Sequence, residues 1–390
     1  MRKALITLLV IALPTAIALL TYLLLNPRSA PTSRNATGRV TTLAGAGHAG
    51  VEDNRAPEAS FSDPFGVAVD KLGNVFVADG GDGNRIRRIT PAGTVDTIAG
   101  SEEGFADGPA KEARFNTPSG LAIDKSGNII IADTSNNRIR KIDARGRVST
   151  LAGSGAAGLQ DGPAGEAEFD GPLAVSVDDD GNVFVADTYN DAIRVISEDG
   201  MVRTLAGGVA GYVDGLAVDA LFDTPSGIAV DEEGSIFVAD TGNDVIRKIT
   251  PQGEVITFAG GGLDRQDGQG SEAGFDRPLG IVVTHDGFLF VAEEGTGRVR
   301  RITPEGEVTT YAGRSPGYAD ATGSGARFNR PSGVAIDRQG NLYVADAHNY
   351  LIRRIAPVAS SEAKMSGDEK TDTFLQPPNG PVGMDAGSIV

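Results

Sequence analysis

The sequence predicts an all-β fold, namely a six-bladed β-propeller of four-stranded antiparallel blades. A phrase of three largely apolar residues, an alanine and an acidic residue recurs at intervals of 53 or 54 residues, ending at Asp79, Asp133, Asp187, Asp240, Glu293 and Asp346. This period suits one propeller blade and exceeds that of common helical repeats. Each period also contains four short apolar segments separated by turns, which is the strand content of one blade.

The first element along the chain is a predicted membrane anchor. Arg2 and Lys3 precede an apolar run over residues 4–25, which is long enough to cross a bilayer as a helix. The run exceeds the apolar region of a cleaved signal peptide and no small-residue cleavage site follows it, so we expect an uncleaved signal anchor. Residues 1–3 would be cytoplasmic and residues 26–39 a linker. The propeller would then lie in the periplasm or outside the cell.

The second copy of the repeat illustrates the strands of one blade. Residues 120–124 alternate in polarity and meet residues 129–132 across a Gly127-Asn128 turn, which is typical of a β-hairpin. A polar turn leads to a third segment, 138–142, and a further turn at 144–146 leads to a fourth, 148–152. The repeat therefore predicts four consecutive antiparallel strands.

The ends of the repeat region predict how the ring closes. The phrase of the fourth strand occurs once before the first blade, from Val40 to Gly45, and no copy follows Ile355. We therefore expect residues 40–43 to supply the missing outer strand of the sixth blade, which would remove an exposed edge. The propeller would span residues 40–357. Residues 358–390 lose the apolar alternation and are predicted to form a disordered tail.

The last blade carries a family resemblance. Residues 331–355 read Pro-Ser-Gly-Val-Ala-Ile-Asp, then Gly-Asn-Leu-Tyr-Val-Ala-Asp, and then Asn349-Tyr350-Leu351 at the position of a family signature. This pattern resembles the NHL-repeat family of six-bladed β-propellers, as found in membrane-anchored bacterial-type proteins. The family includes protein-binding, RNA-binding and sensor domains, and related propellers are lactonases and lyases. The resemblance therefore implies the fold and leaves the function open.

The charged residues that recur in almost every blade are predicted to be structural. Each repeated acidic residue ends a strand and precedes a turn, where a carboxylate can accept backbone N–H bonds. Six arginines share one apolar strand position and need carboxylate or carbonyl partners there: Arg87, Arg140, Arg194, Arg247, Arg300 and Arg353. The long loop between blades repeats a phenylalanine, such as Phe115, which we expect to fill a wedge between blades.

No catalytic residue and no metal site are predicted. One residue per blade follows the opening proline and would line the channel mouth: Phe65, Ser119, Leu173, Ser226, Leu279 and Ser332. These positions lack the carboxylates and amides that a metal-dependent enzyme would need at the axis. Calcium at the loop carboxylates Asp107, Asp161, Asp214 and Asp267 is one cofactor alternative left open. A metal shared by His48 and His348 across the ring closure is the other.

Binding residues are predicted on the upper face, where the loops that vary between blades come together. The candidates are Tyr189, Tyr212, Asp244, Tyr318, His348 and Tyr350. Tyrosines with scattered acids suit the recognition of a protein, peptide or glycan. The formal charge of −17 disfavours nucleic acid.

The sequence thus favours a membrane-anchored binding or sensing platform. The alternative is a metal-dependent lactonase or lyase that resembles the gluconolactonase type of propeller. A carboxylate and amide cluster inside the channel would separate the two hypotheses.

Overall fold

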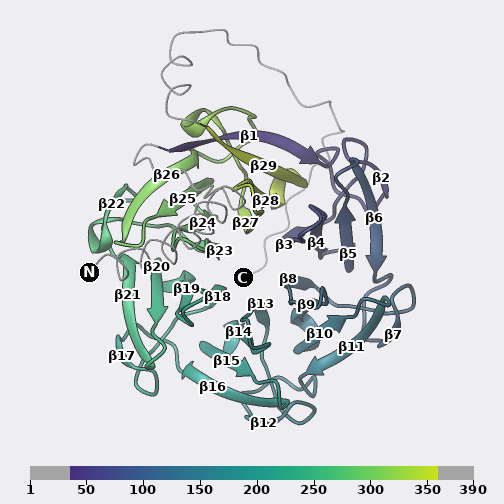
Figure 1. The fold of residues 1–390 in the computed structure, drawn as a ribbon, viewed down its shortest axis with the longest axis horizontal. Helices are drawn as coiled ribbons and strands as arrows, with labels where there is room; N and C mark the ends of the chain where they lie inside the picture. Colours follow the sequence, from purple (N-terminus) through teal and green to yellow (C-terminus); the bar gives the residue numbers. More distant parts are fainter. Residues whose placement is uncertain (1–35, 359–390) are drawn as a thin grey trace, which may run out of the picture.

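A computed structural model describes residues 36–358 of the chain. The predicted cytoplasmic residues, the membrane anchor, residues 26–35 of the linker and residues 359–390 of the tail lie outside this range. Within residues 36–358, no helix is long and apolar enough to span a bilayer. The described residues form six small sheets arranged around a central axis (Figure 1).

The four main strands of each blade run from the axis outwards. The innermost strands are β3 (Pro64–Val69), β8 (Pro118–Ile123), β13 (Pro172–Val177), β18 (Pro225–Val230), β23 (Pro278–Val283) and β27 (Pro331–Ile336). The second strands are β4 (Val75–Asp79), β9 (Ile129–Asp133), β14 (Val183–Asp187), β19 (Ile236–Asp240), β24 (Leu289–Glu293) and β28 (Leu342–Asp346). We number the blades one to six in this order.

The outer half of each blade is built in the same way. The third strands are β5 (Arg85–Ile89), β10 (Arg138–Ile142), β15 (Ala192–Ile196), β20 (Val245–Ile249), β25 (Arg298–Ile302) and β29 (Leu351–Val358). The fourth strands are β6 (Thr94–Ala99), β11 (Arg147–Ala152), β16 (Met201–Gly207), β21 (Glu254–Gly260), β26 (Glu307–Gly313) and, in blade six, β1 (Thr37–Ala44). All neighbouring strands within a blade pair antiparallel.

The predicted closure of the ring is confirmed. Strand β1 pairs with β29, and Val40 lies opposite Ile355. Figure 1 shows β1, in purple, lying along the yellow C-terminal strand of blade six. The strand begins at Thr37, three residues before the predicted start of the propeller. One blade is therefore assembled from both ends of the repeat region, which removes an exposed edge.

The prediction of four strands per blade is wrong for five of the six blades. A two-residue fifth strand pairs with the fourth strand in each of them: β2 (Asn54–Arg55), β7 (Gly108–Pro109), β12 (Gly162–Pro163), β17 (Gly215–Leu216) and β22 (Gly268–Gln269). These strands come from the long loop between blades, which crosses the outer edge of the blade it is about to enter. Blade six has only a single bridge in this place, between Arg39 and Thr322.

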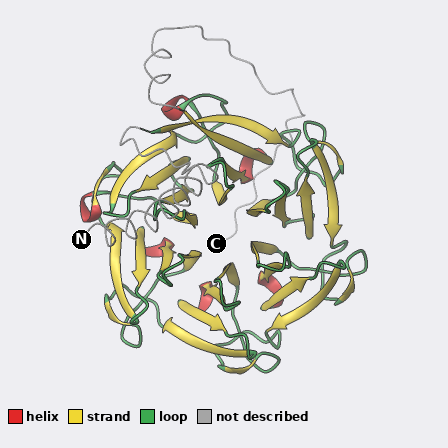
Figure 2. Cartoon of the chain, in the orientation of Figure 1, coloured by secondary structure: helices red, strands yellow, loops and turns green. Residues whose placement is uncertain are grey.

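Short 3-10 helices complete the described residues. Four of them follow second strands: η1 (Thr134–Asn136), η2 (Thr188–Asn190), η3 (Thr241–Asn243) and η6 (Ala347–Asn349). Two others lie in loops between blades, η4 (Gly270–Glu272) and η5 (Gly323–Gly325). Figure 2 shows that these turns are the helical content of an otherwise β-stranded ring.

A buried arginine holds each blade together. Its Nη1 donates to the acidic residue that ends the second strand, at 2.5 to 3.1 Å. Its Nη2 donates at 2.5 to 2.9 Å to an aspartate of the loop between blades. The six arginines are fully buried, as predicted for structural groups. The same loop aspartates include Asp107, Asp161, Asp214 and Asp267, which were the calcium candidates.

The repeated phenylalanine packs against this arginine. In every blade its ring centroid lies 4.8 to 5.2 Å from the guanidinium carbon, and the ring is buried between neighbouring sheets. This position confirms the predicted wedge. Desolvation strengthens such a cation–π contact, so the loop between blades is fixed by both an ion pair and an aromatic ring.

Glycines allow the innermost strands to meet at the axis. A Cβ atom at Gly227 would lie 1.9 Å from the carbonyl oxygen of Leu279, and one at Gly66 would lie 2.2 Å from that of Ser119. Both glycines therefore touch the backbone of the following blade. This contact leaves an axial cavity of only about 70 Å³.

We expect Gly227→Ala to destabilise the protein by about 3 kcal/mol, because the added methyl group meets fixed backbone. The free energy of unfolding of the full chain, measured by urea denaturation, checks this. Gly165→Ala is the matched control, since Gly165 is exposed and its Cβ would meet nothing within 4 Å. Equal denaturation midpoints for the two variants would contradict close packing at the axis.

The buried aspartates predict an unusual pH dependence. Burial raises the pKa of Asp79 and of Asp187 to about 6, although an arginine and other donors surround each carboxylate. The folded state then binds more protons than the unfolded state between about pH 4 and pH 6. The stability that this uptake confers is complete below about pH 4 and is lost as the pH rises through about 6.

We therefore expect the urea midpoint to be higher at about pH 5 than at about pH 7.5. Carbon-13 NMR of the aspartate carboxyl groups should show the two high pKa values directly. The pKa of Asp161 is lowered instead, through hydrogen bonds from Thr204 and Arg194 that outweigh its burial. The stability that ionised Asp161 contributes is lost only as the pH falls through this lowered pKa, so it does not affect the comparison of about pH 5 with about pH 7.5. A urea midpoint that is lower at about pH 5 than at about pH 7.5 would refute the expectation.

Candidate binding site at the upper mouth of the channel

The axial cavity is lined by backbone and apolar side chains. Its walls come from the innermost strands and include Val67, Leu121, Ile228 and Ile281. We call the end where these strands begin the upper mouth. The turns after the second strands lie at the same end, because the Asn136 side chain donates to the Gly104 carbonyl of the loop between blades.

The six predicted mouth residues lie at the upper ends of the innermost strands. The hydroxyl groups of the three serines among them donate to backbone carbonyls of the fold. Ser119 donates to the carbonyl of Thr117, Ser226 to that of Thr224, and Ser332 to that of Phe65. Phe65 and Leu173 are half-buried, and Leu279 is buried. This set of donors does not fit a metal ion, which would need converging carboxylate, amide or imidazole ligands.

Two of the predicted binding tyrosines share one repeated position. Tyr212 and Tyr318 occupy it in blades four and six, where Phe105 stands in blade two. Each tyrosine ring packs on the buried arginine of its blade. The guanidinium carbon of Arg247 lies 5.1 Å from the Tyr212 ring centroid, and that of Arg353 lies 4.9 Å from the Tyr318 centroid. Their hydroxyl groups contact threonines of the outer strands, Thr257 and Thr42. They are about half exposed and lie on separate blades.

Tyr189, which is 66% exposed, is a third predicted tyrosine and lies on another blade. It lies in η2, and its ring covers Gly171 at the opening of blade three. A large apolar ring with this exposure is available for recognition.

Asp244 belongs to a latch between blades that the sequence analysis missed. The residue at this turn position adopts a left-handed conformation, and its side chain accepts the N–H of the residue before the next blade's proline. The four bonds, of 2.6 to 2.9 Å, are Asn84 to Thr117, Asn137 to Gly171, Asp191 to Thr224 and Asp244 to Arg277. Gly297 and Tyr350 replace the acceptor in blades five and six. The signal available in the sequence was the recurrence of Asn or Asp at this position, since these residue types are enriched at positive φ.

A second hydrogen bond between blades is present in three blades and is replaced in the other three. In blades two to four the residue after the repeated aspartate is a buried threonine that donates to the next proline carbonyl, as Thr241 does to Pro278 at 2.6 Å. Blade five has Glu294 at this position, blade six has Ala347 and blade one has Gly80. The departures from sixfold repetition therefore gather in blades five, six and one.

Glu294 organises a charged cluster at this part of the mouth. Its side chain is only 6% exposed and lies between two arginines of adjacent blades, Arg277 and Arg330. Arg277 Nε donates to Glu294 Oε2 at 2.6 Å, and Arg330 Nε and Nη2 both contact Glu294 Oε1. Burial of a carboxylate is costly unless it is paired, so the two guanidinium groups are needed here.

The cluster also includes His348 and Asp63. Arg330 Nη1 donates to His348 Nε2 at 3.2 Å, so His348 is joined to the cluster from blade six. The pKa of Asp63 is raised, because desolvation of its carboxyl group outweighs the favourable charges of His348 and Arg330. Among residues 36–358, no three acidic, histidine or cysteine side chains group as a metal site would require.

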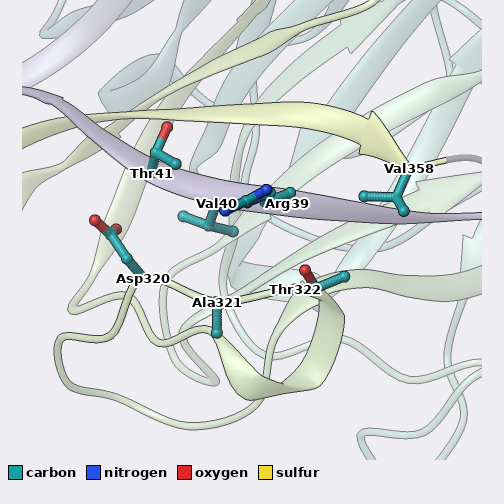
Figure 3. Close-up of a pocket in the computed structure, with 7 residues that line it drawn as sticks. All are labelled: Arg39, Val40, Thr41, Asp320, Ala321, Thr322 and Val358. Carbon is teal, nitrogen blue, oxygen red and sulfur yellow. The ribbon is translucent and has the colours of Figure 1, made fainter. Parts of the chain in front are cut away.

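A second hollow lies at the outer edge of blade six. It has a volume of about 420 Å³ and runs between β1 and the loop at Asp320 to Thr322 (Figure 3). A hydrogen bond of 2.8 Å from the Val40 N–H to the Ala321 carbonyl joins its two sides. The hollow marks the place where the other blades have a two-residue fifth strand.

Comparisons with known proteins agree with the fold. The family model of the NHL repeat matches residues 115–142, 222–246 and 328–355. The chloroplastic protein SUPPRESSOR OF QUENCHING 1 of Arabidopsis thaliana is 32% identical over 327 residues, covering 78% of this chain and 31% of that protein. NHL repeat-containing protein 2 of Bos taurus is 28% identical over 312 residues, covering 67% and 43%. The chain thus spans about a third to two-fifths of these curated relatives.

Solved structures with the same fold have distant sequences. An auxiliary nutrient binding protein from Bacteroides ovatus superposes with a TM-score of 0.62 at 17% identity, covering 83% of this chain and 78% of that one. A gluconolactonase from Xanthomonas campestris gives a TM-score of 0.57 at 17% identity, covering 82% and 90%. At this identity the likeness concerns the architecture alone.

Proposed function

The chain belongs to the NHL-repeat family of six-bladed β-propellers, and from that premise we propose that it is a binding or sensing platform. Its ligand would be a protein, peptide or glycan, recognised by the upper face. One observation carries the proposal. The blades repeat one structural plan, and their departures from it collect at the upper mouth around Glu294, while the axis below is narrow and apolar.

Several features of the upper face support recognition. Tyr189 offers an exposed aromatic ring, and His348 is exposed beside Arg330. Aromatic and arginine side chains contribute most of the binding energy in typical protein interfaces. The structural likeness to a nutrient binding protein favours the same class of role, as an analogy of fold.

The lactonase or lyase alternative receives less support. The likeness to a gluconolactonase extends to the fold, but the residues that line this channel supply no set of carboxylate or amide ligands. A reaction at the axis would need such groups to polarise or deprotonate its substrate. The mouth serines donate their hydroxyl hydrogens to backbone carbonyls instead.

A capture experiment tests the role of the upper face. The full chain would be used as bait with extracts of the source cells, beside a Tyr189→Ala, His348→Ala double variant. We expect the double variant to lose most of the captured ligand, since truncating a central contact typically costs about 2 kcal/mol or more.

Leu72→Ala is the matched control for that experiment. Leu72 is 73% exposed and lies in the turn between β3 and β4, at the opposite end of the blade from the upper mouth. Its variant should retain capture. Equal loss in both variants, or no loss in either, would count against recognition through the upper face.

We further propose that the propeller is anchored outside the cytoplasm by residues 4–25, whose apolar length and preceding Arg2 and Lys3 motivate this assignment. Protease added to intact cells, or to spheroplasts if an outer membrane is present, should remove an epitope placed in the propeller. A cytoplasmic marker protein in the same sample should survive. Full protection of the epitope until the cells are lysed would exclude this topology.

A further inference from the structure

The charged cluster at the mouth has an unequal distribution of hydrogen-bond donors. Arg330 uses Nε and Nη2 on Glu294 and Nη1 on His348. Arg277 uses only Nε on Glu294, at 2.6 Å. Within residues 36–358, the Nη1 and Nη2 atoms of Arg277 have no protein acceptor, and the side chain is 58% exposed. Arg277 therefore presents two donors towards solvent.

The orientation of these donors is fixed by the fold. The backbone N–H of Arg277 is held by Asp244 of the preceding blade, and its Nε is held by the buried carboxylate of Glu294. Side chains restrained in this way lose less conformational entropy when they bind a ligand. The remaining edge of a guanidinium group matches the two oxygens of a carboxylate.

The surroundings restrict the ligand further. Leu279, two residues after Arg277, is one of the mouth residues, and the cavity below it is lined by glycine backbone and aliphatic side chains. Glu294 balances one of the two arginine charges, and Asp63 lies near Arg330 and His348. Asp244 adds a third carboxylate beside Arg277. These acidic groups disfavour a highly charged polyanion, so the free edge of Arg277 suits a single carboxylate beside an apolar body.

We propose that Arg277, oriented by Glu294, binds the carboxylate of an organic acid whose apolar part rests over the channel mouth. The proposal rests on the proposed role of the upper face and names the chemistry recognised there. A purely structural clasp between blades five and six would require Arg330 and Glu294, but it would leave the Arg277 terminal nitrogens without a role.

Ligand-observed NMR titrations of the full chain test this site. The probes are N-acetyl-leucine, which carries a carboxylate like that of a peptide C-terminus, its neutral amide, and gluconate as a sugar acid. We expect saturable binding of N-acetyl-leucine and none of the amide. Tighter binding of gluconate would keep the carboxylate site and assign it to sugar acids, and it would overturn the apolar part of the proposal.

Variants of Arg277 separate this role from stability. Arg277→Gln should weaken binding about tenfold or more, because a hydrogen bond to a charged group contributes about 1.5 kcal/mol or more. Arg277→Lys should recover only part of the affinity, since lysine keeps the charge but loses the paired donors. Arg145→Ala is the control, as Arg145 is exposed in the turn before β11, away from the mouth.

Thermal unfolding of each variant shows that it is folded before binding is compared. Equal binding of the acid and its amide, or unchanged binding by folded Arg277→Gln, would overturn the proposal. A folded wild-type chain that binds none of the probes would also overturn it. In that case capture of a ligand through Tyr189 and His348 could still succeed, so failure of this inference is distinguishable from failure of the proposed function.

Discussion

The buried arginine in the third strand of each blade is the interaction on which the rest of the ring depends. It connects the end of the second strand to the loop that arrives from the preceding blade. That loop must therefore run along the outer edge, where it adds a fifth strand in five of the blades, before it turns towards the axis. Removing one partner of such a buried pair typically costs about 3 to 5 kcal/mol, because the other charge stays buried.

The sixfold repeat made most of the fold predictable. Period, strand order, ring closure through Val40 and the burial of the repeated phenylalanines all follow from patterns that recur many times. The fifth strands could not be predicted, because two residues such as Gly108 and Pro109 carry no alternation. Their pairing depends on where the loop between blades is held, as by the ion pair between Asp107 and Arg140 in blade two, which joins residues far apart in the sequence.

The candidate site was harder to predict because its residues are unremarkable one at a time. Arg277 and Arg330 each precede a proline in different blades, and Glu294 follows the more conspicuous Glu293. Only the curvature of the ring brings the three side chains together. Among the residues that were predicted, His348 joins this cluster, whereas the Asp244 side chain accepts the backbone N–H of Arg277.

The pairing of β1 with β29 has a mechanical consequence. Thr37 lies opposite Val358, so the two ends of the described chain leave the same sheet at the same point. A force that draws these ends apart would load the hydrogen bonds between the strands one after another, as in a zipper. A force applied along a single strand would load them together. Tension between the two ends would therefore open blade six first, while the other five blades carry no load across their strands.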